Sequence, residues 1–342
     1  MGKKACYLII SVFVLCAIFV HGPIPAKMSE QLGGPPFSDP SEKMEMPSEW
    51  RERAIEYDQW AKGADMAVTL DQHLYPALKP LIEQFAADRK MHIRIQEGTC
   101  GISSGMLSKK QVDMGGYCCP PAPTDRLPGL EYHTLGISPL AILVNAGNPV
   151  KDISLETVRD IFRGNVTNWS QVSAAHERYN VPIRVVGRLH CKQRPGHWRL
   201  ILDNEDLFAT KLYEVSSIRD MIATLSDTRG TIGYEVLWNI GRHEAAGKVK
   251  PIMISGADPR REEDMLTKKY PFYRVYNITS WREKSGVDKE AGRELADFLR
   301  KKFSTVSAEY GIIPAERLRE AGWHFSADEL VGEPSGIDGK EN

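Results

Sequence analysis

The side chains with the most distinctive chemistry in this sequence are its cysteines. Two of the six lie in an apolar N-terminal run, and the other four lie in predicted loops, at Cys100, Cys118, Cys119 and Cys191. Thiolates bind soft cations such as Cu(I) and Zn(II) and thiophilic metalloids such as arsenite, whereas an oxidising compartment favours disulfides. The spacings contain neither a Cys-x-x-Cys pair nor a recognised metal-binding pattern, so the residue types alone leave both kinds of chemistry open.

A basic segment from residue 188 to 197 has the composition of an anion site. It contains Arg188, Lys192 and Arg194, and a guanidinium holds an oxyanion with two hydrogen bonds at once. Gly101 and Gly196 each precede a predicted helix start, where free N–H groups and the helix dipole favour negative charge. We expect Arg188 to contact the ligand, because it directly follows a predicted strand.

Catalysis is a third kind of chemistry to consider. Cys191 with His190 and His197 supplies a nucleophile and a base, but adjacent residues of an extended segment point in opposite directions and no third group orients the base. The sequence has no Gly-x-x-x-x-Gly-Lys loop, no His-Glu-x-x-His pair and no Cys-x-x-Cys-His segment. We therefore predict a binding protein and not an enzyme.

The N-terminus predicts export. Lys3 and Lys4 precede an apolar run over residues 5–20, and a helix-breaking stretch leads to Ala26. This order is typical of a cleaved secretory signal peptide over residues 1–26, and the run is short for a membrane anchor. A lipid anchor on Cys16 is not expected, because the bulky Leu15 precedes it where a lipoprotein site requires a small residue. A periplasmic location is expected.

Length and charge bound the function further. The 342 residues are 42% hydrophobic and 26% charged, which suits two lobes with separate cores. The formal net charge of -1 argues against nucleic acid as a partner. We expect a monomer.

Strands alternate with helices along the body of the chain. After a flexible leader over residues 27–63, with a helix from Ser48 to about Trp60, the apolar patterns predict strand, helix, strand, short helix and strand over 66–70, 72–89, 92–96, 100–107 and 112–116. A long strand is expected over 137–145, and further elements over 154–162, 183–187, 231–234, 249–255, 273–278 and 289–303. The alternation predicts an α/β fold with parallel strands and ligand loops at their carboxyl ends.

Several phrases in this order resemble the periplasmic phosphate-binding protein family, the type II solute receptors of ABC transporters. They spread across residues 65–318, and the most specific is Leu155-Glu156-Thr157-Val158-Arg159-Asp160-Ile161-Phe162-Arg163-Gly164. The other matching phrases cover residues 98–102, 112–116, 141–150, 167–169, 185–188, 230–234 and 310–314.

The resemblance implies a Venus-flytrap fold of two lobes joined by a two-strand hinge near Asn145 and residues 233–235. Lobe I would comprise residues 64–145 and 235–325, lobe II residues 146–234, and a C-terminal tail residues 326–342. Four loops would meet the ligand, over 69–72, 98–103, 116–120 and 188–197. The expected contact residues are Thr69, Leu70, Thr99, Cys100, Gly101, Tyr117, Cys118, Arg188, Cys191, Gly196 and His197.

The loops depart from the family pattern where the ligand would lie. Cys118 stands where the family has a phosphate-binding Asp, and Cys100 occupies the middle of a Gly-Ser-Gly-like turn. The family's hydroxyl-rich cradle is replaced by residues 188–197, which contain no Ser or Thr. These changes argue against orthophosphate as the ligand.

Two interpretations of the departures remain open. If the loops converge as in the family, Cys100, Cys118 and Cys191 hold a soft metal or metalloid ion, with Cys119, His73, His190 and His197 nearby. Alternatively, the cysteines form disulfides beside a site for phosphate or another oxyanion. In either case the partner is an ABC permease or a sensor kinase. A thiol redox or metal-sequestering protein without a transporter is the hypothesis from a different class.

Overall fold

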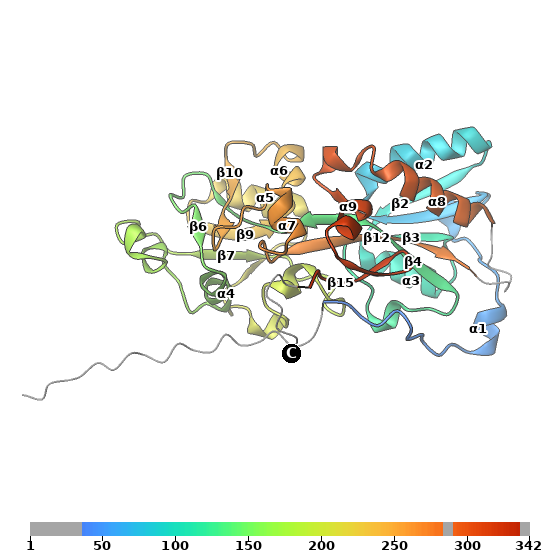
Figure 1. Ribbon diagram of the computed structural model, residues 1–342, viewed down its shortest axis with the longest axis horizontal. Helices are drawn as coiled ribbons and strands as arrows, with labels where there is room; N and C mark the ends of the chain where they lie inside the picture. Colours follow the sequence, from blue (N-terminus) through green and yellow to red (C-terminus); the bar gives the residue numbers. More distant parts are fainter. Residues whose placement is uncertain (1–35, 283–289, 336–342) are drawn as a thin grey trace, which may run out of the picture. The chain divides into compact units, whose positions relative to one another are not determined.

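The computed structural model describes residues 36–282 and 290–335, so the predicted signal peptide lies outside the described residues. Two sheets organise this part of the chain (Figure 1). The six-stranded sheet has the order β13 (Ile313–Pro314), β4 (Leu130–Pro139), β12 (Tyr273–Trp281), β3 (Met114–Tyr117), β1 (Met66–Asp71) and β2 (Ile93–Gly98). The five-stranded sheet has the order β10 (Val249–Pro251), β5 (Ala141–Asn145), β9 (Thr231–Glu235), β7 (Arg184–Gly187) and β8 (Tyr213–Glu214).

Two small ladders and nine α-helices complete the described fold. The ladders pair β6 (Asp152–Ile153) with β11 (Met253–Ile254), and β14 (His324–Ser326) with β15 (Glu329–Gly332). The α-helices are α1 (Ser48–Glu52), α2 (Tyr75–Arg89), α3 (Cys100–Ser108), α4 (Leu155–Arg163), α5 (Ile218–Asp227), α6 (Trp238–Arg242), α7 (Glu262–Leu266), α8 (Glu290–Phe303) and α9 (Ala315–Glu320). Short 3-10 helices cover Gln59–Ala61, Pro123–Asp125, Trp169–Gln171, Ala174–His176, His197–Leu200, Glu205–Leu207 and Ser307–Tyr310.

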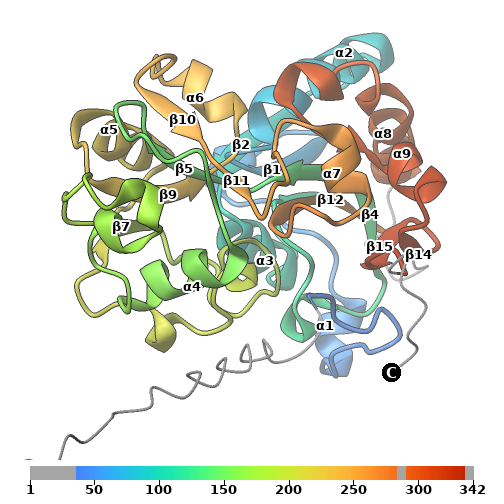
Figure 2. The same cartoon turned by 60° about the vertical axis from the view of Figure 1, so that its left-hand side comes forward.

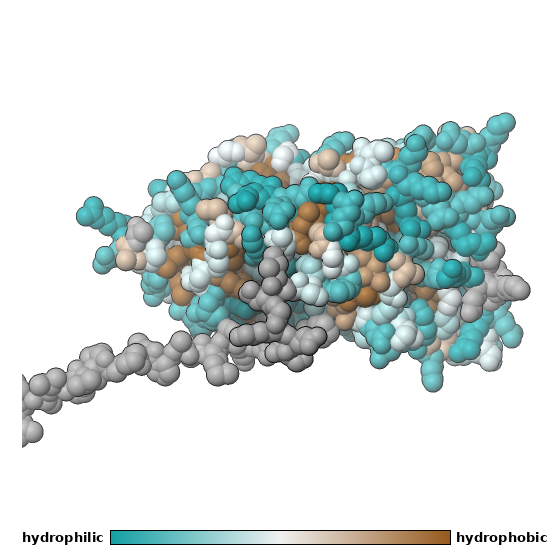
Figure 3. All heavy atoms as spheres, in the orientation of Figure 1, coloured by the Kyte–Doolittle hydropathy of each residue, from teal (hydrophilic) through white to brown (hydrophobic). Residues whose placement is uncertain are grey.

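Each sheet has its own apolar core, and we call the two halves the first and second lobes. Helices α2 and α8 cover the six-stranded sheet, where the rings of Phe85 and Phe298 lie 5.4 Å apart (Figure 2). Helices α4 and α5 bury Phe162 and Leu225 in the core of the five-stranded sheet. On the face drawn in Figure 3, hydrophilic residues predominate and apolar ones are interspersed, as expected when the apolar side chains fill interior cores.

Two adjacent segments connect the lobes. Strand β4 of the first sheet ends at Pro139, and β5 of the second begins at Ala141. Between them, the Leu140 amide donates to the carbonyl oxygen of Phe272 at 3.0 Å, just before β12 returns to the first sheet. The structure therefore moves the predicted hinge from Asn145 to these residues, because Asn145 pairs with Val249 inside the second sheet.

The predicted residue limits of lobes I and II also disagree with the division of the strands between the two sheets. Strands β5 and β10, which those limits assign to lobe I, pair in the five-stranded sheet. The expectation of parallel strands also holds only in part. Strands β1, β2 and β3 are parallel, as are β7, β8 and β9, whereas β4, β5, β10, β12 and β13 make antiparallel pairs.

The predicted flexible leader is wrong over residues 36–63, which pack on the body. The Trp50 indole donates to the Ser108 carbonyl oxygen at 2.6 Å, and the Tyr57 hydroxyl bonds Asp113 Oδ2 at 2.6 Å. The helix predicted from Ser48 to Trp60 ends at Glu52, because the backbone of Arg53 is extended. The residues after Arg53 lie alongside the end of α3.

The predicted C-terminal tail is also partly structured. Strands β14 and β15 form a hairpin, and Glu329 makes a buried ion pair with Arg126 at 2.7 Å. Among residues 36–282 and 290–335, no helix combines the length and apolar character required to cross a membrane.

Candidate functional site

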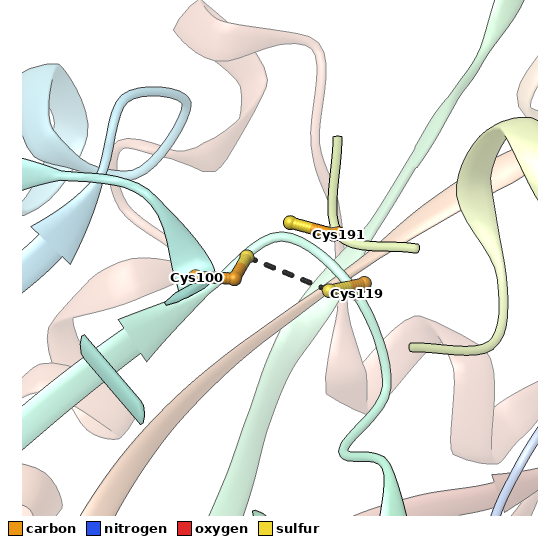
Figure 4. A group of neighbouring side chains, drawn as sticks. All are labelled: Cys100, Cys119 and Cys191. Carbon is orange, nitrogen blue, oxygen red and sulfur yellow. Dashed lines mark hydrogen bonds between the residues drawn. The ribbon is translucent and has the colours of Figure 1, made fainter. Parts of the chain in front are cut away.

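Four cysteines from three segments of the chain meet between the lobes. Figure 4 draws three of them, Cys100, Cys119 and Cys191. Cys100 begins α3, Cys118 and Cys119 follow β3, and Cys191 lies in the loop after β7. The Cys100 sulfur is 3.5 Å from the sulfurs of both Cys118 and Cys119. Cys100, Cys119 and Cys191 have their three Sγ atoms within 4.8 Å of one another, and we call them the thiol triad. All four cysteines are free thiols in the structure.

Local structure determines where the Cys100 sulfur lies. Thr99 caps α3 by accepting the Ile102 amide at 3.3 Å, which turns the chain from β2 into the helix at Cys100. The Cys118 amide then donates to the Cys100 sulfur at 3.2 Å. The end of β3 and the start of α3 thus hold two thiols in contact before any ligand is considered.

The thiols differ in their tendency to ionise. Hydrogen bonds from Cys100 and Cys119, with the nearby Arg274 guanidinium, lower the pKa of the Cys118 thiol well below its usual value. Hydrogen bonds from Cys100 and Cys119 also lower the pKa of Cys191. Burial instead raises the pKa of Cys100 and of Cys119. The site therefore favours thiolates at two positions and thiols at the other two.

Two stacked histidine rings border the cysteines. The rings of His190 and His197 have centroids 5.3 Å apart and an interplanar angle of 18°. His197 Nδ1 accepts the Trp198 amide at 2.7 Å, so the neutral ring carries its proton on Nε2. Burial lowers the pKa of His197 to about 4, which keeps the ring neutral near pH 7. His197 Nε2 thus carries a proton and is buried without a hydrogen-bond partner among the described residues, and the Cys191 side chain partly opposes the lowering of the His197 pKa.

The loop that carries Cys191 has a constrained backbone. Cys191 and His197 adopt φ of 57° and 41°, a left-handed conformation that is uncommon for residues other than glycine. Gly196 has φ of 82°, and a Cβ at this position would lie 2.8 Å from Pro120 Cδ in the cysteine loop of the first lobe. Such conformations persist where the surroundings enforce them, and they cluster at functional sites.

Arg188 lies buried at the end of β7, with contacts to both lobes. Its guanidinium donates to the Ser216 carbonyl oxygen at 3.2 Å and approaches Gln72 Oε1 at 3.4 Å. It also contacts His190 Nε2 at 3.3 Å. Arg188 therefore borders the cysteine cluster through His190, and its contact with a ligand remains a prediction.

The other predicted contact residues occupy varied positions. Thr69 is buried, and its hydroxyl has no hydrogen-bond partner among the described residues. Leu70 packs against Gly116 in the first core, and Gly101 is exposed on the first turn of α3. Tyr117 is buried beside Tyr132, at a centroid distance of 5.5 Å, and under the Arg194 guanidinium. Leu70 and Tyr117 thus pack in the first core, and contact of these residues and of Gly101 with a ligand stays a prediction.

A buried ion network that the sequence analysis did not identify joins the two lobes beside the cysteines. His73 lies between Asp71 at the end of β1 and Glu235 at the end of β9, with N–O distances of 2.8 and 2.9 Å. Burial and Arg274 oppose the charge of His73, but Glu235 and Asp71 outweigh them and raise its pKa well above 6.5. His73, predicted as a neighbour of the site, therefore connects the lobes as a cation.

The same network contacts the thiols. The Cys100 sulfur lies 3.7 Å from Asp71 Oδ2, and Arg274 Nη1 donates to the Cys118 sulfur at 3.4 Å. Arg274 Nε lies 4.0 Å from Glu235. Asp71 could have been identified from the sequence as a candidate site residue, because it is the last residue of its strand. Arg274 lies inside an apolar strand, and only the fold shows which residues are its neighbours.

Two lobes joined by two adjacent segments, with loops from both lobes converging between them, define a type II periplasmic-binding-protein fold. A family model described as "PBP superfamily domain" matches residues 58–301, and the chain belongs to this superfamily. The "Phosphate-binding protein PstS" of Bacillus subtilis (strain 168) is 24% identical over 255 residues, which cover 71% of this chain and 79% of that protein. This similarity confirms the resemblance to phosphate-binding proteins seen in the sequence.

Solved structures agree on the fold. A putative phosphate ABC transporter substrate-binding protein with bound phosphate from Clostridium perfringens superposes with a TM-score of 0.61 at 16% identity, covering 73% of this chain and 99% of that one. An ABC-type phosphate transport receptor from Vibrio cholerae gives a TM-score of 0.59 at 20% identity, with coverage of 73% and 99%. The chain is therefore a solute-binding domain of the phosphate-binding-protein type.

Proposed function

We propose that this protein is an extracytoplasmic receptor that captures a thiophilic metal or metalloid ion between its lobes and presents it to an ABC permease or a sensor kinase. The observation that carries the proposal is the thiol triad, in which three sulfurs from both lobes lie within 4.8 Å of one another. An ion bonded to all three sulfurs stabilises the closed arrangement of the lobes, because the bonds exist only when the loops converge.

The dimensions of the triad favour a single ion over an oxyanion. Sulfurs 3.5 Å apart are in van der Waals contact, which leaves no room for a tetrahedral anion between them. A metal ion bonded at about 2.3 Å to each sulfur requires S–S distances of about 3.8 Å in tetrahedral geometry. The Cys100–Cys119 distance of 3.5 Å is near this value, and the Cys191 sulfur lies within 4.8 Å of both. The donor set is also soft, and soft thiolates select soft ions.

The test is a binding titration of the reduced protein under anaerobic conditions with Cu(I), Zn(II), arsenite and phosphate as separate probes. We expect at least one of the first three to raise the melting temperature, with a shift that grows with the logarithm of its concentration above the dissociation constant. Cys100→Ser should weaken that binding by more than about 100-fold, since groups that only contact a metal ligand already contribute 10–100-fold. Ser108→Ala, on the same helix, is the control and should bind as the parent does. Binding of phosphate alone, unchanged in Cys100→Ser, would refute the proposal.

A phosphate or other oxyanion receptor is the second candidate, favoured by the similarity to phosphate-binding proteins. In this case Cys100 forms a disulfide with Cys118 or Cys119, which brings their sulfurs from 3.5 Å to about 2.05 Å. The oxidised protein should then bind phosphate, and reduction should not weaken that binding. A thiol protein without a transporter would bind the ion equally well but show no association with a permease or kinase.

A further inference from the structure

We infer that the captured species is a trivalent metalloid supplied as its uncharged hydroxide, of which arsenite is the representative, bound through three sulfurs. The inference rests on the proposed function and specifies its ligand class. It follows from the number of donor atoms at the triad, from the charge that the buried site can hold, and from the exchange reaction that the thiols can perform.

The triad offers three donor atoms and not four. Cys118 lies outside it, because its sulfur groups with Cys100 and Asp71 and is bonded by Arg274 at 3.4 Å (Figure 4 shows the three triad members). A closed structural zinc site requires four ligands, whereas a trivalent metalloid is saturated by three and carries a lone pair on its open side. The separation of Cys118 therefore favours a three-coordinate centre.

The neighbouring histidines do not supply a fourth donor. His197 Nδ1 accepts the Trp198 amide, so the Nε2 atom of the neutral ring carries a proton and offers no lone pair to a metal. His190 Nδ1 lies 3.0 Å from the Arg188 carbonyl oxygen, and its Nε2 faces the Arg188 guanidinium at 3.3 Å. Both lone pairs that a metal would use are thus engaged or protonated in the described structure.

The charge of the complex discriminates among soft ions. Three thiolates around Cu(I) have a net charge of -2 and around Zn(II) of -1, whereas three around a trivalent centre are neutral. Cys100 and Cys119 are 0% exposed, and an uncompensated charge there is costly. Part of the nearby positive charge is already balanced, since Arg194 pairs with Asp125 at 2.6 Å and Arg274 contacts the Cys118 sulfur, although the Nε atom of each has no hydrogen-bond partner among the described residues. A neutral complex therefore fits this site best.

The reaction balances without an oxidant or reductant. Each thiol replaces one hydroxide, so three metalloid–oxygen bonds break, three metalloid–sulfur bonds form, and each thiol proton leaves with its hydroxide as water. Where the cysteine is already a thiolate, the departing hydroxide takes its proton from solvent and leaves as water. The metalloid stays trivalent throughout, and the uncharged hydroxide enters a buried site without the desolvation cost of a free ion.

The experiment uses the reduced full-length chain with sodium arsenite, Zn(II) and Cu(I) as probes, and three measurements. X-ray absorption of the arsenite complex of the parent protein should show three sulfur neighbours and no oxygen. Cys119→Ser should weaken arsenite binding by more than about 100-fold, and Cys118→Ser by no more than about tenfold, the lower end for groups that only contact a ligand. The absorption measurement on the parent remains decisive if a variant fails to fold.

The possible outcomes separate this inference from the proposed function. Tight binding of Zn(II) or Cu(I) without arsenite binding overturns the metalloid assignment but leaves a receptor for a thiophilic ion. An equal loss of arsenite binding in Cys118→Ser and Cys119→Ser, or oxygen neighbours around the bound arsenic, overturns the three-sulfur site. Failure of all three probes overturns both proposals.

Discussion

Removal of the His73 side chain should destabilise the protein strongly, because His73 is the cation between two buried carboxylates. His73→Ala removes contacts of 2.8 Å to Asp71 and 2.9 Å to Glu235, and the three side chains are at most 3% exposed. Loss of one partner from a buried pair costs about 3–5 kcal/mol, since the remaining charge is left uncompensated. At about 2–4 °C per kcal/mol for a domain of 150–250 residues, the melting temperature should fall by about 6–20 °C.

The assay is thermal unfolding followed by circular dichroism, with denaturant unfolding for the free energy. His92→Ala is the matched control, because His92 is exposed and its ring makes only a 3.5 Å contact to the Gly63 carbonyl oxygen. Since Asp71 and Glu235 belong to different lobes, His73→Ala should also increase the radius of gyration measured by small-angle scattering. Equal melting temperatures for the two variants would refute the assignment of His73 as the interlobe cation.

The dependence of this effect on pH has a definite sign. The pKa of His73 is raised above 6.5 in the folded protein by Glu235 and Asp71, so its stabilising contribution is complete below pH 6.5 and is lost as the pH rises through the raised value. The pKa of Glu235 is lowered from 4.5 by His73 and Arg274 despite burial, so its contribution is present above pH 4.5 and is lost in acid. The difference between the parent and His73→Ala should therefore be largest between pH 4.5 and 6.5 and shrink in alkaline solution.

Two further predictions concern the loop of the second lobe and the C-terminal hairpin. Gly196→Ala should destabilise by about 1 kcal/mol or more, because φ is 82° and the new Cβ would meet Pro120 at 2.8 Å; denaturant unfolding measures the loss, and an unchanged midpoint would contradict the strain. Glu329→Ala should cost about 3–5 kcal/mol, because it leaves the Arg126 guanidinium buried without its carboxylate; a loss as small as that of an exposed pair would show that the hairpin is not anchored there.

Periodicity was sufficient to predict the α/β fold, and the resemblance of an ordered set of phrases to phosphate-binding proteins indicated its family. The apolar runs placed β1, α2, β2, α3 and β3 in the correct order, with ends displaced by a few residues. Each of these elements has a short-range pattern of buried apolar residues, which can be recognised directly in the sequence.

The long apolar run over 137–145 was misinterpreted for a physical reason. A strand buried on both faces and a strand that passes from one sheet into another have the same composition. Leu140 separates β4 from β5, with its amide bonded to Phe272 and its carbonyl oxygen bonded by the Tyr270 hydroxyl, and both partners are remote in the sequence. The hinge was therefore misplaced, although two crossing segments were expected.

The candidate site was predictable in part. The convergence of Cys100 and Cys191 follows from the positions of their loops in the fold, which the family resemblance supplied. Which of Cys118 and Cys119 joins the triad does not follow from the positions of the loops. Adjacent residues project in different directions, and the backbone after β3 decides which sulfur faces the triad. Arg274 was not predicted as a site residue, because the role of a charged residue in an apolar strand can be inferred only when its partners are known.

The ion network and the thiols together indicate how a fold of the phosphate-binding type can serve a different ligand. Asp71 contacts Cys100 on one side and His73 on the other, so the connection between the lobes passes within 3.7 Å of a thiol-triad sulfur. In this structure the interlobe contact of His73 and the Cys100 sulfur of the thiol triad therefore share Asp71 as a neighbour. An ion that bonds the three sulfurs thus favours the arrangement in which His73 joins the lobes. Under the proposed function, replacement of the residues at the loop tips changes the ligand class while the hinge and the interlobe contact, which lie in the scaffold, are kept.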